Sequence, residues 1–293
     1  MVIDLDDYRE LIALDRPFAR PAAADPPSVP ALVTRLLTTL HGEGLTVPAN
    51  MAGQPDRTQL RALLTVRTPG VLPDSVLHEI DALLQLEHEQ QGSVAHRSLG
   101  DPGTQETTLR AGDRCTVWRG DITRLQIDAI VNAANDRMLG CFVPFHACID
   151  NAIHDKAGPR LRADCAAVMG KQGHHEPQGE AKATRAYNLP SRFVLHTVGP
   201  IVRGRLGAHH VAALERCYES CLSLAARIGA TSIALCGIST GLYGFPKAEA
   251  AAVATATVHR WLTDHPHDME HVVFNVFDSE SFDVYASALS RTT

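Results

Sequence analysis

Two cysteines and a histidine lie close together in the middle of the chain. Cys141, His146 and Cys148 fall within eight residues, in the spacing Cys-x4-His-x-Cys. Thiolate and imidazole groups are zinc ligands, and three protein ligands leave a fourth position for water or substrate. The same residues could also be two free cysteines and a loop histidine, which are common in proteins. The spacing by itself leaves both interpretations open.

Polar side chains flank this cluster on both sides. Asn132 and Asn135 lie three residues apart at the end of a predicted strand, and each amide can both donate to and accept from a sugar hydroxyl. Asp150 follows the second cysteine closely, at the start of a predicted helix. Its carboxylate could orient a water molecule or could simply be stabilised by the positive end of that helix. If the neighbouring loops are left out of account, simple stabilisation at the start of the helix is favoured.

Two further loops have residues suited to binding a nucleotide. Asp121 follows a predicted strand, and its carboxylate could accept a hydrogen bond from an exocyclic amine or cap its own turn. The segment from Ser239 to Pro246 is rich in glycine and precedes a predicted helix, so its backbone N–H groups could bind a diphosphate. An ordinary strand-to-helix connection would also use these glycines. The segment matches neither the Walker loop nor the dinucleotide-binding fingerprint.

Alternating strands and helices are predicted to position these loops. The predicted strands are Cys115–Arg119, Ala129–Asn132, Ala183–Tyr187, Phe193–Val198, Ser232–Cys236 and Val272–Phe277. The predicted helices between and after them are Ile149–Lys156, Pro159–Gly170, Ala208–Ile228, Pro246–Thr263 and Ser281–Leu289. This order predicts an α/β layered domain with a largely parallel or mixed sheet. In such sheets, ligands bind where loops leave the carboxyl ends of the strands.

The chain before this region shows helical patterning and no convincing strand. Helices are predicted from Ser28 to Gly42, over Asp56–Val66 and over Asp74–Glu89. The segment that follows is rich in Gly, Ser, Thr and Gln, which is typical of a linker. We therefore predict a helical N-terminal extension over residues 1–92, a linker over 93–112 and an α/β domain over 113–293.

The composition narrows the class of protein further. The chain has 293 residues, of which 45% are hydrophobic and 20% charged, as in a globular protein with a substantial core. A net charge of −6 argues against nucleic acid as a partner. We expect no membrane partner, because the longest uncharged stretch is interrupted by glycines, serines and threonines. Seven cysteines without a secretory signal predict reduced thiols and a cytoplasmic protein.

Five motifs in this order resemble a macrodomain of the hydrolytic, MacroD-like type. They are GDIT, DAIVNAAN, CIDNAIH, EAKATRAYNLPSRFVLHTVGP and CGISTGLYGFPK, and the resemblance covers the chain from about Cys115 to its end. Usual members have a Gly-rich run where this sequence reads GCFVPFHAC. That departure is similar to the zinc-dependent macrodomains, the protein–ADP-ribose hydrolases, which also carry a helical N-terminal extension. The resemblance implies a three-layer α/β fold with a mixed central sheet.

The resemblance also implies roles for individual residues. Asp121 and the backbone of Ile122 would contact adenine, on which Phe277 would stack, and Asn135 would hold the distal ribose beside the helix start at Cys148, Ile149 and Asp150. The diphosphate would be wrapped by the loop of Ser239, Thr240, Gly241, Leu242, Tyr243, Gly244 and Phe245, with Phe245 also near the distal ribose. Asp150 and Asn135 would be catalytic, and Cys141, His146 and Cys148 would bind Zn²⁺.

The function that the resemblance implies is zinc-dependent removal of mono-ADP-ribose from Asp and Glu side chains of modified proteins. A lipoyl-carrier protein is the expected kind of protein substrate, because zinc macrodomains of bacteria are often encoded beside one. Three alternatives share parts of this site: an ADP-ribose reader without activity, an O-acetyl-ADP-ribose deacetylase, and a structural zinc module for protein interaction. The segment with Cys141, His146 and Cys148, together with Asp150, distinguishes the hydrolase from the reader, since a reader has little need of an open metal site.

Overall fold

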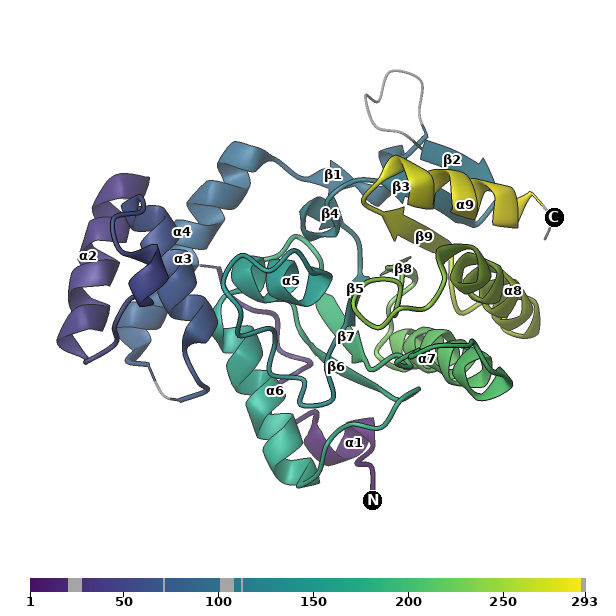
Figure 1. Cartoon of the computed structure of the whole chain (residues 1–293), viewed down its shortest axis with the longest axis horizontal. Coiled ribbons are helices and arrows are strands. Elements are labelled where there is room, and N and C mark those ends of the chain that lie inside the picture. Colours follow the sequence, from purple (N-terminus) through teal and green to yellow (C-terminus); the bar gives the residue numbers. More distant parts are fainter. Residues whose placement is uncertain (21–27, 71, 101–107, 112, 291–293) are drawn as a thin grey trace.

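The computed structural model describes residues 1–20, 28–70, 72–100, 108–111 and 113–290 (Figure 1). Its helices are α1 (Leu5–Tyr8), α2 (Val29–Gly42), α3 (Asp56–Val66), α4 (Asp74–Gln91), α5 (Ile149–Ala157), α6 (Pro159–Gln172), α7 (Ala208–Arg227), α8 (Lys247–Asp264) and α9 (Ser279–Leu289). Its strands are β1 (Val94–Ala95), β2 (Thr108–Ala111), β3 (Cys115–Arg119), β4 (Leu125–Gln126), β5 (Ala129–Ala133), β6 (Ala181–Arg185), β7 (Phe193–Thr197), β8 (Ser232–Leu235) and β9 (His271–Val276). The short 3-10 helices among the described residues are η1 (Ala49–Met51), η2 (His96–Ser98) and η3 (Ile122–Arg124).

A mixed sheet forms the centre of the larger part of the molecule. Its described strands lie in the order β2-β3-β9-β8-β5-β7-β6, and the five inner strands are parallel to one another. The two edge strands, β2 and β6, run antiparallel to the strands beside them. The short strands β1 and β4 pair separately and in parallel. The carboxyl ends of the inner strands therefore meet at one edge of the sheet.

Successive residues of the inner strands enter different hydrophobic cores. Val117, Val131 and Leu195 pack with α7, α8 and α9 on one face, whereas Trp118 and Ile130 pack with α5 and α6 on the other. This follows from the strand geometry, in which adjacent side chains point to opposite faces. Figure 1 shows the two groups of helices on either side of the sheet. The structure thus confirms the predicted three-layer α/β fold with a mixed central sheet.

Helices α2, α3 and α4 form a unit with a core of its own, which we call the helical unit. Its buried residues are mainly leucines, including Leu36, Leu40, Leu60 and Leu63. Pro30 lies in the first turn of α2, where a missing N–H costs nothing. The unit stands at one end of the molecule in Figure 1, beside α5 and α6. The predicted helical region before the α/β domain is confirmed.

The segment predicted as a linker differs from that expectation. It contains β1, η2 and β2, and β2 adds a strand to the edge of the main sheet by pairing with β3. Residues 101–107 and 112 of this segment lie outside the described residues. Gly, Ser, Thr and Gln indicate a loop by composition, but an edge strand needs only backbone pairing on one side, which composition does not reveal. The sheet thus begins at Thr108 rather than after residue 112.

Helix α1 lies outside all of the elements predicted from the sequence. Leu5 and Tyr8 of α1 are buried in the core that contains α7. The backbone N–H of Ala183 on β6 donates to the Tyr8 hydroxyl at 2.8 Å. An edge strand exposes unpaired N–H groups, so α1 satisfies one of them and covers that edge of the sheet.

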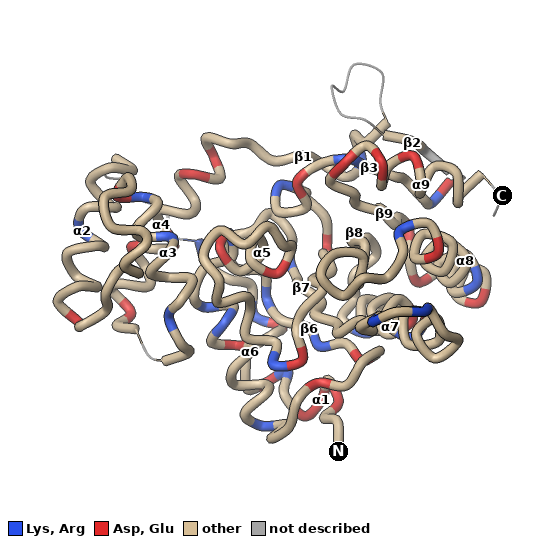
Figure 2. The backbone as a smooth tube through the Cα atoms, in the orientation of Figure 1, with Lys and Arg blue, Asp and Glu red and all other residues tan. Residues whose placement is uncertain are grey.

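Charged residues of both signs are spread over the described part of the molecule. Figure 2 shows Lys and Arg interspersed with Asp and Glu along both the helical unit and the sheet region. Across the described ranges, no helix has the length and apolar character required to cross a membrane.

Candidate functional site

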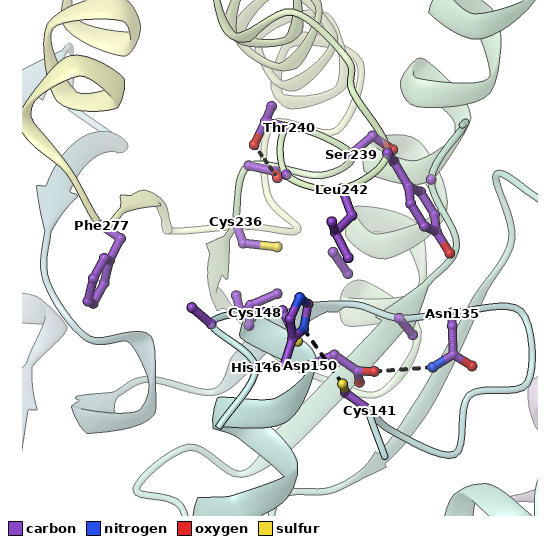
Figure 3. A pocket seen from close by; sticks show the side chains of 18 of the residues that line it. Asn135, Cys141, His146, Cys148, Asp150, Cys236, Ser239, Thr240, Leu242 and Phe277 are labelled. Atoms are coloured by element: carbon purple, nitrogen blue, oxygen red, sulfur yellow. Dashed lines mark hydrogen bonds between the residues drawn. The ribbon is translucent and has the colours of Figure 1, made fainter. Parts of the chain in front are cut away.

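A cavity of about 1070 Å³ opens at the carboxyl ends of the inner strands. The segments that follow β5, β8 and β9 line it, together with the start of α5. Figure 3 shows Ser239, Thr240 and Leu242 on one side of the cavity. The side chains opposite them are Asn135, Asp150, Cys141, His146 and Cys148. Thr68 and Pro69, which follow α3 in the helical unit, also line the cavity. Its size is that of a small-molecule or cofactor site.

Cys141, His146 and Cys148 come together at the wall of this cavity. Their ligand atoms all lie within 4.8 Å of one another, and Cys141 Sγ is 3.6 Å from His146 Nδ1. Tetrahedral zinc with ordinary Zn–S and Zn–N lengths separates a sulfur from a nitrogen ligand by about 3.6 Å. The donor set and its geometry therefore fit a zinc ion with an open fourth position. We call residues 140–148 the metal loop.

The start of α5 fixes the metal loop from behind. Cys148 is the N-cap of α5, and its Sγ accepts a hydrogen bond from the Asn151 backbone N–H at 3.4 Å. The Asn151 side-chain amide donates to the carbonyls of Val143, at 3.0 Å, and His146, at 3.1 Å. Burial raises the pKa of the Cys148 thiol to about 12, and a bound cation would oppose that shift. The loop conformation therefore does not depend on the metal alone.

Asp150 lies beneath the metal loop and is 5% exposed. The Asn132 amide donates to its Oδ1 at 2.8 Å, and the Asn135 amide donates to its Oδ2 at 3.3 Å. Burial raises the pKa of Asp150 to about 6, although both amides and the Arg162 cation favour the ionised form. Asn135 also donates to the Gly140 carbonyl at 3.0 Å and so joins the carboxylate to the metal loop.

Asn132 and Asn135 have different positions in the structure. Asn135 lines the cavity, as expected for a sugar ligand, whereas Asn132 is fully buried and does not line it. The expectation that both amides face sugar hydroxyls is therefore wrong for Asn132, which holds Asp150 instead. Asn132 lies within β5, and its side chain points to the face of the sheet that α5 covers, away from the loop that follows the strand.

The loop from Ser239 to Phe245 lines the cavity with five of its seven residues. Ser239, Thr240, Gly241, Leu242 and Tyr243 face the cavity, whereas Gly244 and Phe245 do not line it. Ser239 has a φ of +64°, and its carbonyl accepts a hydrogen bond from the Phe245 N–H at 3.0 Å. Phe245 is 2% exposed and packs in the core beneath the loop. In this structure the ring supports the loop rather than facing the cavity.

The expected adenine end of the site contains Phe277 but not Asp121. Phe277 follows β9, is 84% exposed and lines the cavity. Asp121 and Ile122 do not line it; Asp121 Oδ1 accepts from the Thr123 N–H at 2.9 Å and caps η3. The Asn275 amide donates to the Gly120 carbonyl at 2.9 Å and holds this loop beside the end of β9. The Asp121 loop thus borders the cavity through Asn275.

Several cavity residues were not expected from the sequence. Gly199 and Cys236 belong to motifs that carry the resemblance, so their position after β7 and β8 was a usable signal. Asn275, near the end of β9, and Tyr285, on α9, offered no such signal. Thr68 and Pro69 belong to the helical unit, which showed no reactive constellation. Only the packing of that unit against the α/β domain brings them to the cavity.

A second cluster with metal-ligand side chains lies buried behind Asp150. It consists of His154, Cys165 and His196, whose ligand atoms also lie within 4.8 Å of one another. His196 Nδ1 is 3.1 Å from the Asn132 amide nitrogen, which donates to it, so the ring proton lies on Nε2, 3.0 Å from Thr184 Oγ1. Both ring nitrogens of His196 are thereby engaged, and burial raises the pKa of the Cys165 thiol well above its usual range. The engagement of both His196 nitrogens by protein groups favours a packing role for this cluster beneath the site.

Comparison with known proteins identifies the family. The model of the family described as "Macro domain" matches residues 131–254. A protein named "Protein-ADP-ribose hydrolase" from Treponema medium is 46% identical over 231 residues, which cover 79% of this chain and 86% of that protein. A protein of the same name from Staphylococcus aureus strain Mu50 is 43% identical, with 79% of this chain and 84% of that protein covered. The chain belongs to the macrodomain family.

Solved structures agree with this assignment. The macrodomain of Oceanobacillus iheyensis with ADP is 34% identical with a TM-score of 0.56, covering 64% of this chain and 96% of that one. The Trypanosoma brucei macrodomain in complex with ADP-ribose is 29% identical with a TM-score of 0.56, covering 93% of this chain and 99% of that one. The second similarity extends over most of the helical N-terminal region as well as the sheet.

Proposed function

We propose that this protein is a zinc-dependent hydrolase that removes mono-ADP-ribose from Asp and Glu side chains of modified proteins. The observation that carries the proposal is the meeting of a Cys-His-Cys loop and a buried aspartate in one nucleotide-sized cavity. The names of the two relatives above support the hydrolase part. The two solved macrodomains with ADP and ADP-ribose support the same ligand class for this cavity.

The proposed binding follows the order of groups along the cavity. Phe277 stacks on adenine at one end, and the loop from Ser239 to Tyr243 surrounds the diphosphate with backbone N–H groups. Asn135 binds a hydroxyl of the distal ribose beside the metal loop. This arrangement places the anomeric carbon, and the ester oxygen bonded to it, near Asp150 and the three ligand residues.

Hydrolysis then breaks the bond between the anomeric carbon and the carboxylate oxygen of the modified side chain. Water attacks the anomeric carbon, the Asp or Glu carboxylate leaves, and Asp150 accepts the proton of the attacking water. Asn132 and Asn135 hold the Asp150 carboxylate in one orientation for this transfer. Zinc bound by Cys141, His146 and Cys148 would act as a Lewis acid on an oxygen of the reactants.

The alternatives differ in which residues they need. A reader of ADP-ribose needs Phe277 and the diphosphate loop but has no use for a carboxylate buried beside an open metal site. An O-acetyl-ADP-ribose deacetylase would use the same residues as the hydrolase, and we keep it as the second candidate.

The protein substrate that we propose is a lipoyl-carrier protein. The compartment that we propose is a reducing cytoplasm, which would keep Cys141 and Cys148 as thiols.

The first experiment measures release of ADP-ribose from a protein modified on carboxylates, with zinc per chain counted in the same preparation. O-Acetyl-ADP-ribose is tested in parallel, since faster turnover of it would favour the deacetylase. Release with close to one zinc per chain supports the hydrolase. Tight binding of ADP-ribose without release from either substrate would leave the protein a reader.

Cys148→Ala tests the role of the metal loop separately. We expect the zinc content to fall and the release of ADP-ribose to drop about 100-fold, with ADP-ribose affinity changed much less. The matched control is Cys115→Ala, because Cys115 is also a partly buried free cysteine but does not line the cavity. Equal losses of activity and affinity in Cys148→Ala would make zinc an element of binding alone.

A further inference from the structure

Arg162 joins the helical unit to the metal loop. It lies on α6 and is 7% exposed, and its Nη1 donates to the carbonyls of Leu64 (3.1 Å), Thr65 (3.1 Å) and Arg67 (2.6 Å). Those carbonyls belong to the last turn of α3 and the residue after it, where a helix leaves its carbonyls without partners. The cation therefore caps the C-terminal end of α3, where positive charge is stabilised.

The same guanidinium also faces the metal loop. Its central carbon lies 4.6 Å from the centre of the Phe142 ring, within the range of a cation–π contact. Phe142 directly follows Cys141, one of the three candidate zinc ligands. The edge of the Arg162 guanidinium thus binds the end of α3, and its flat face lies against the Phe142 ring of the metal loop.

A second arginine makes a similar contact from the helical unit itself. Arg61 of α3 lies over the Phe145 ring at 4.9 Å, and its Nε is 3.0 Å from the Asp155 carboxylate on α5. Phe145 precedes His146 and has a φ of +59°, a backbone conformation that residues other than glycine rarely adopt. Contacts from outside the loop help to hold such a conformation. Both phenylalanine rings of the metal loop therefore contact arginines: Arg61 lies within α3, and Arg162 of α6 binds the end of α3.

The turn that follows these carbonyls forms part of the cavity wall. Thr68 and Pro69 come directly after Arg67, whose carbonyl Arg162 binds, and both line the cavity. Arg162 thus fixes the end of α3, the metal loop and this wall at the same point. A helical unit that served only as an appendage would not need to contact the site in this way.

We propose that Arg162 is a positioning residue and that the end of α3 is part of the active site. The residue acts by holding Phe142, and with it the ligand Cys141, at a fixed distance from α5 and from the Thr68–Pro69 wall. The catalytic consequence rests on the proposed function, whereas the positioning itself does not. Without the contact, the metal loop would open more often and would retain zinc less well.

Arg160 offers a matched control on the same helix. Its Nε donates to the buried Asp81 carboxylate of α4 at 2.8 Å, so it also connects α6 to the helical unit. Arg160 does not line the cavity, and its cation–π contact is with Phe18. Arg160→Met therefore removes an arginine from the same interface without touching the metal loop.

The test is hydrogen exchange of the full-length protein, read for peptides that contain residues 142–148. We expect Arg162→Met to speed exchange of these residues about tenfold, while Arg160→Met speeds exchange in α4 and leaves residues 142–148 unchanged. Loss of zinc to a chelator should become faster in Arg162→Met alone. Unchanged exchange in Arg162→Met, or the same change in Arg160→Met, would overturn the proposal.

Phe142→Leu keeps the test decisive if Arg162→Met folds poorly, because it leaves the hydrogen bonds of Arg162 in place. We expect it to speed exchange of residues 142–148 and not of α3, and the double variant to exceed Arg162→Met by less than the sum of the two effects. Additive effects would mean that the two side chains act independently. Wild-type release of ADP-ribose, measured in the same preparation, tests the proposed function separately, since exchange depends on neither turnover nor substrate.

Discussion

Asp150 is the residue on which the proposed chemistry depends most directly. It is buried, both of its oxygens accept hydrogen bonds from asparagine amides, and it lies at the start of the helix capped by Cys148. We expect Asp150→Ala to lower the rate of ADP-ribose release about 100-fold, because a positioned proton acceptor is lost. Affinity for free ADP-ribose, measured by calorimetry, should change by less than about tenfold. Release at the wild-type rate would show that another group takes the proton.

Phe277 allows the binding role to be tested apart from the chemistry. Its ring is 84% exposed, so Phe277→Ala should leave the melting temperature unchanged. We expect the affinity for ADP-ribose to fall about tenfold, since stacking of an aromatic ring on a base contributes about 1–3 kcal/mol. Release at saturating substrate should persist, and Phe277→Trp should restore affinity. A fall in the saturated rate without a change in affinity would place the ring elsewhere on the substrate.

The sequence predicted local constellations better than residues brought together by the fold. Cys141, His146 and Cys148 lie within one short segment, so a common site was one of the two interpretations that their spacing left open, and the structure brings their ligand atoms within 4.8 Å of one another. Asn132 is three residues from Asn135 but lies within β5, where it is buried against Asp150 and His196, whereas Asn135 lies in the loop after the strand and lines the cavity. Asp121 stands beside the cavity as a helix cap, which was the alternative given for it at the outset.

At the scale of elements, the loops after β7 and β8 must pack against each other. A Cβ added at Gly199 would lie 2.1 Å from Ser239 Oγ and 2.6 Å from Ile238 Cγ2. Ser239 already has a φ of +64°, so it has little freedom to move aside. We expect Gly199→Ala to displace the Ser239–Tyr243 loop and to weaken ADP-ribose binding more than about tenfold.

The control for that prediction is Gly170→Ala, because a Cβ at Gly170 meets no atom within 4 Å. Gly170 lies in α6, where alanine stabilises a helix relative to glycine. We expect Gly170→Ala to bind ADP-ribose like the wild type and to melt no lower. Wild-type affinity in Gly199→Ala would mean that the two loops adjust to one another without altering the cavity.

Element boundaries were predictable where side chains carried the pattern. The strand from Cys115 to Arg119 and the helix from Asp56 to Val66 have the predicted bounds. The short strands β1 and β4 and the edge strand β2 were not predicted, since two to four residues show no periodicity that separates strand from loop. Helix α1 has only four residues and depends on its packing against β6 rather than on its own propensity.

For the whole molecule, the helices of the N-terminal unit were predictable but their position was not. Leucine periodicity in α2 to α4 predicts amphipathic helices and a core between them. The docking of the unit includes single polar contacts, such as Arg160 to Asp81 and Arg162 to the carbonyls of Leu64, Thr65 and Arg67. Backbone carbonyls carry no sequence signal, so the approach of α3 to the cavity required the structure.

The buried histidines make the stability of the whole molecule depend on pH. Burial lowers the pKa of His196 to about 3, and it faces His154 on α5 and Cys165 on α6. Burial also lowers the pKa of His154, with further contributions from His196 and Arg162. The unfolded chain binds protons at these rings below about pH 6.5, whereas the folded chain does not. The stability that these two rings contribute is therefore fully present above that pH and is lost as the pH falls toward 3, whereas the raised pKa of Asp150 acts in the opposite direction.

We expect each of these two rings to contribute a fall of about 1.4 kcal/mol per pH unit to the free energy of unfolding below pH 6. His196→Gln should lower stability at pH 7, because the replacement packs less well beside Asn132 and Thr184. The slope of its free energy of unfolding against pH should nevertheless be smaller than that of the wild type, by the contribution of one proton. Urea unfolding at pH 7, 6 and 5 measures both quantities, with His267→Gln, at an exposed position, as the control substitution. An unchanged slope in His196→Gln would mean that His196 binds its proton in the folded protein as readily as in the unfolded chain.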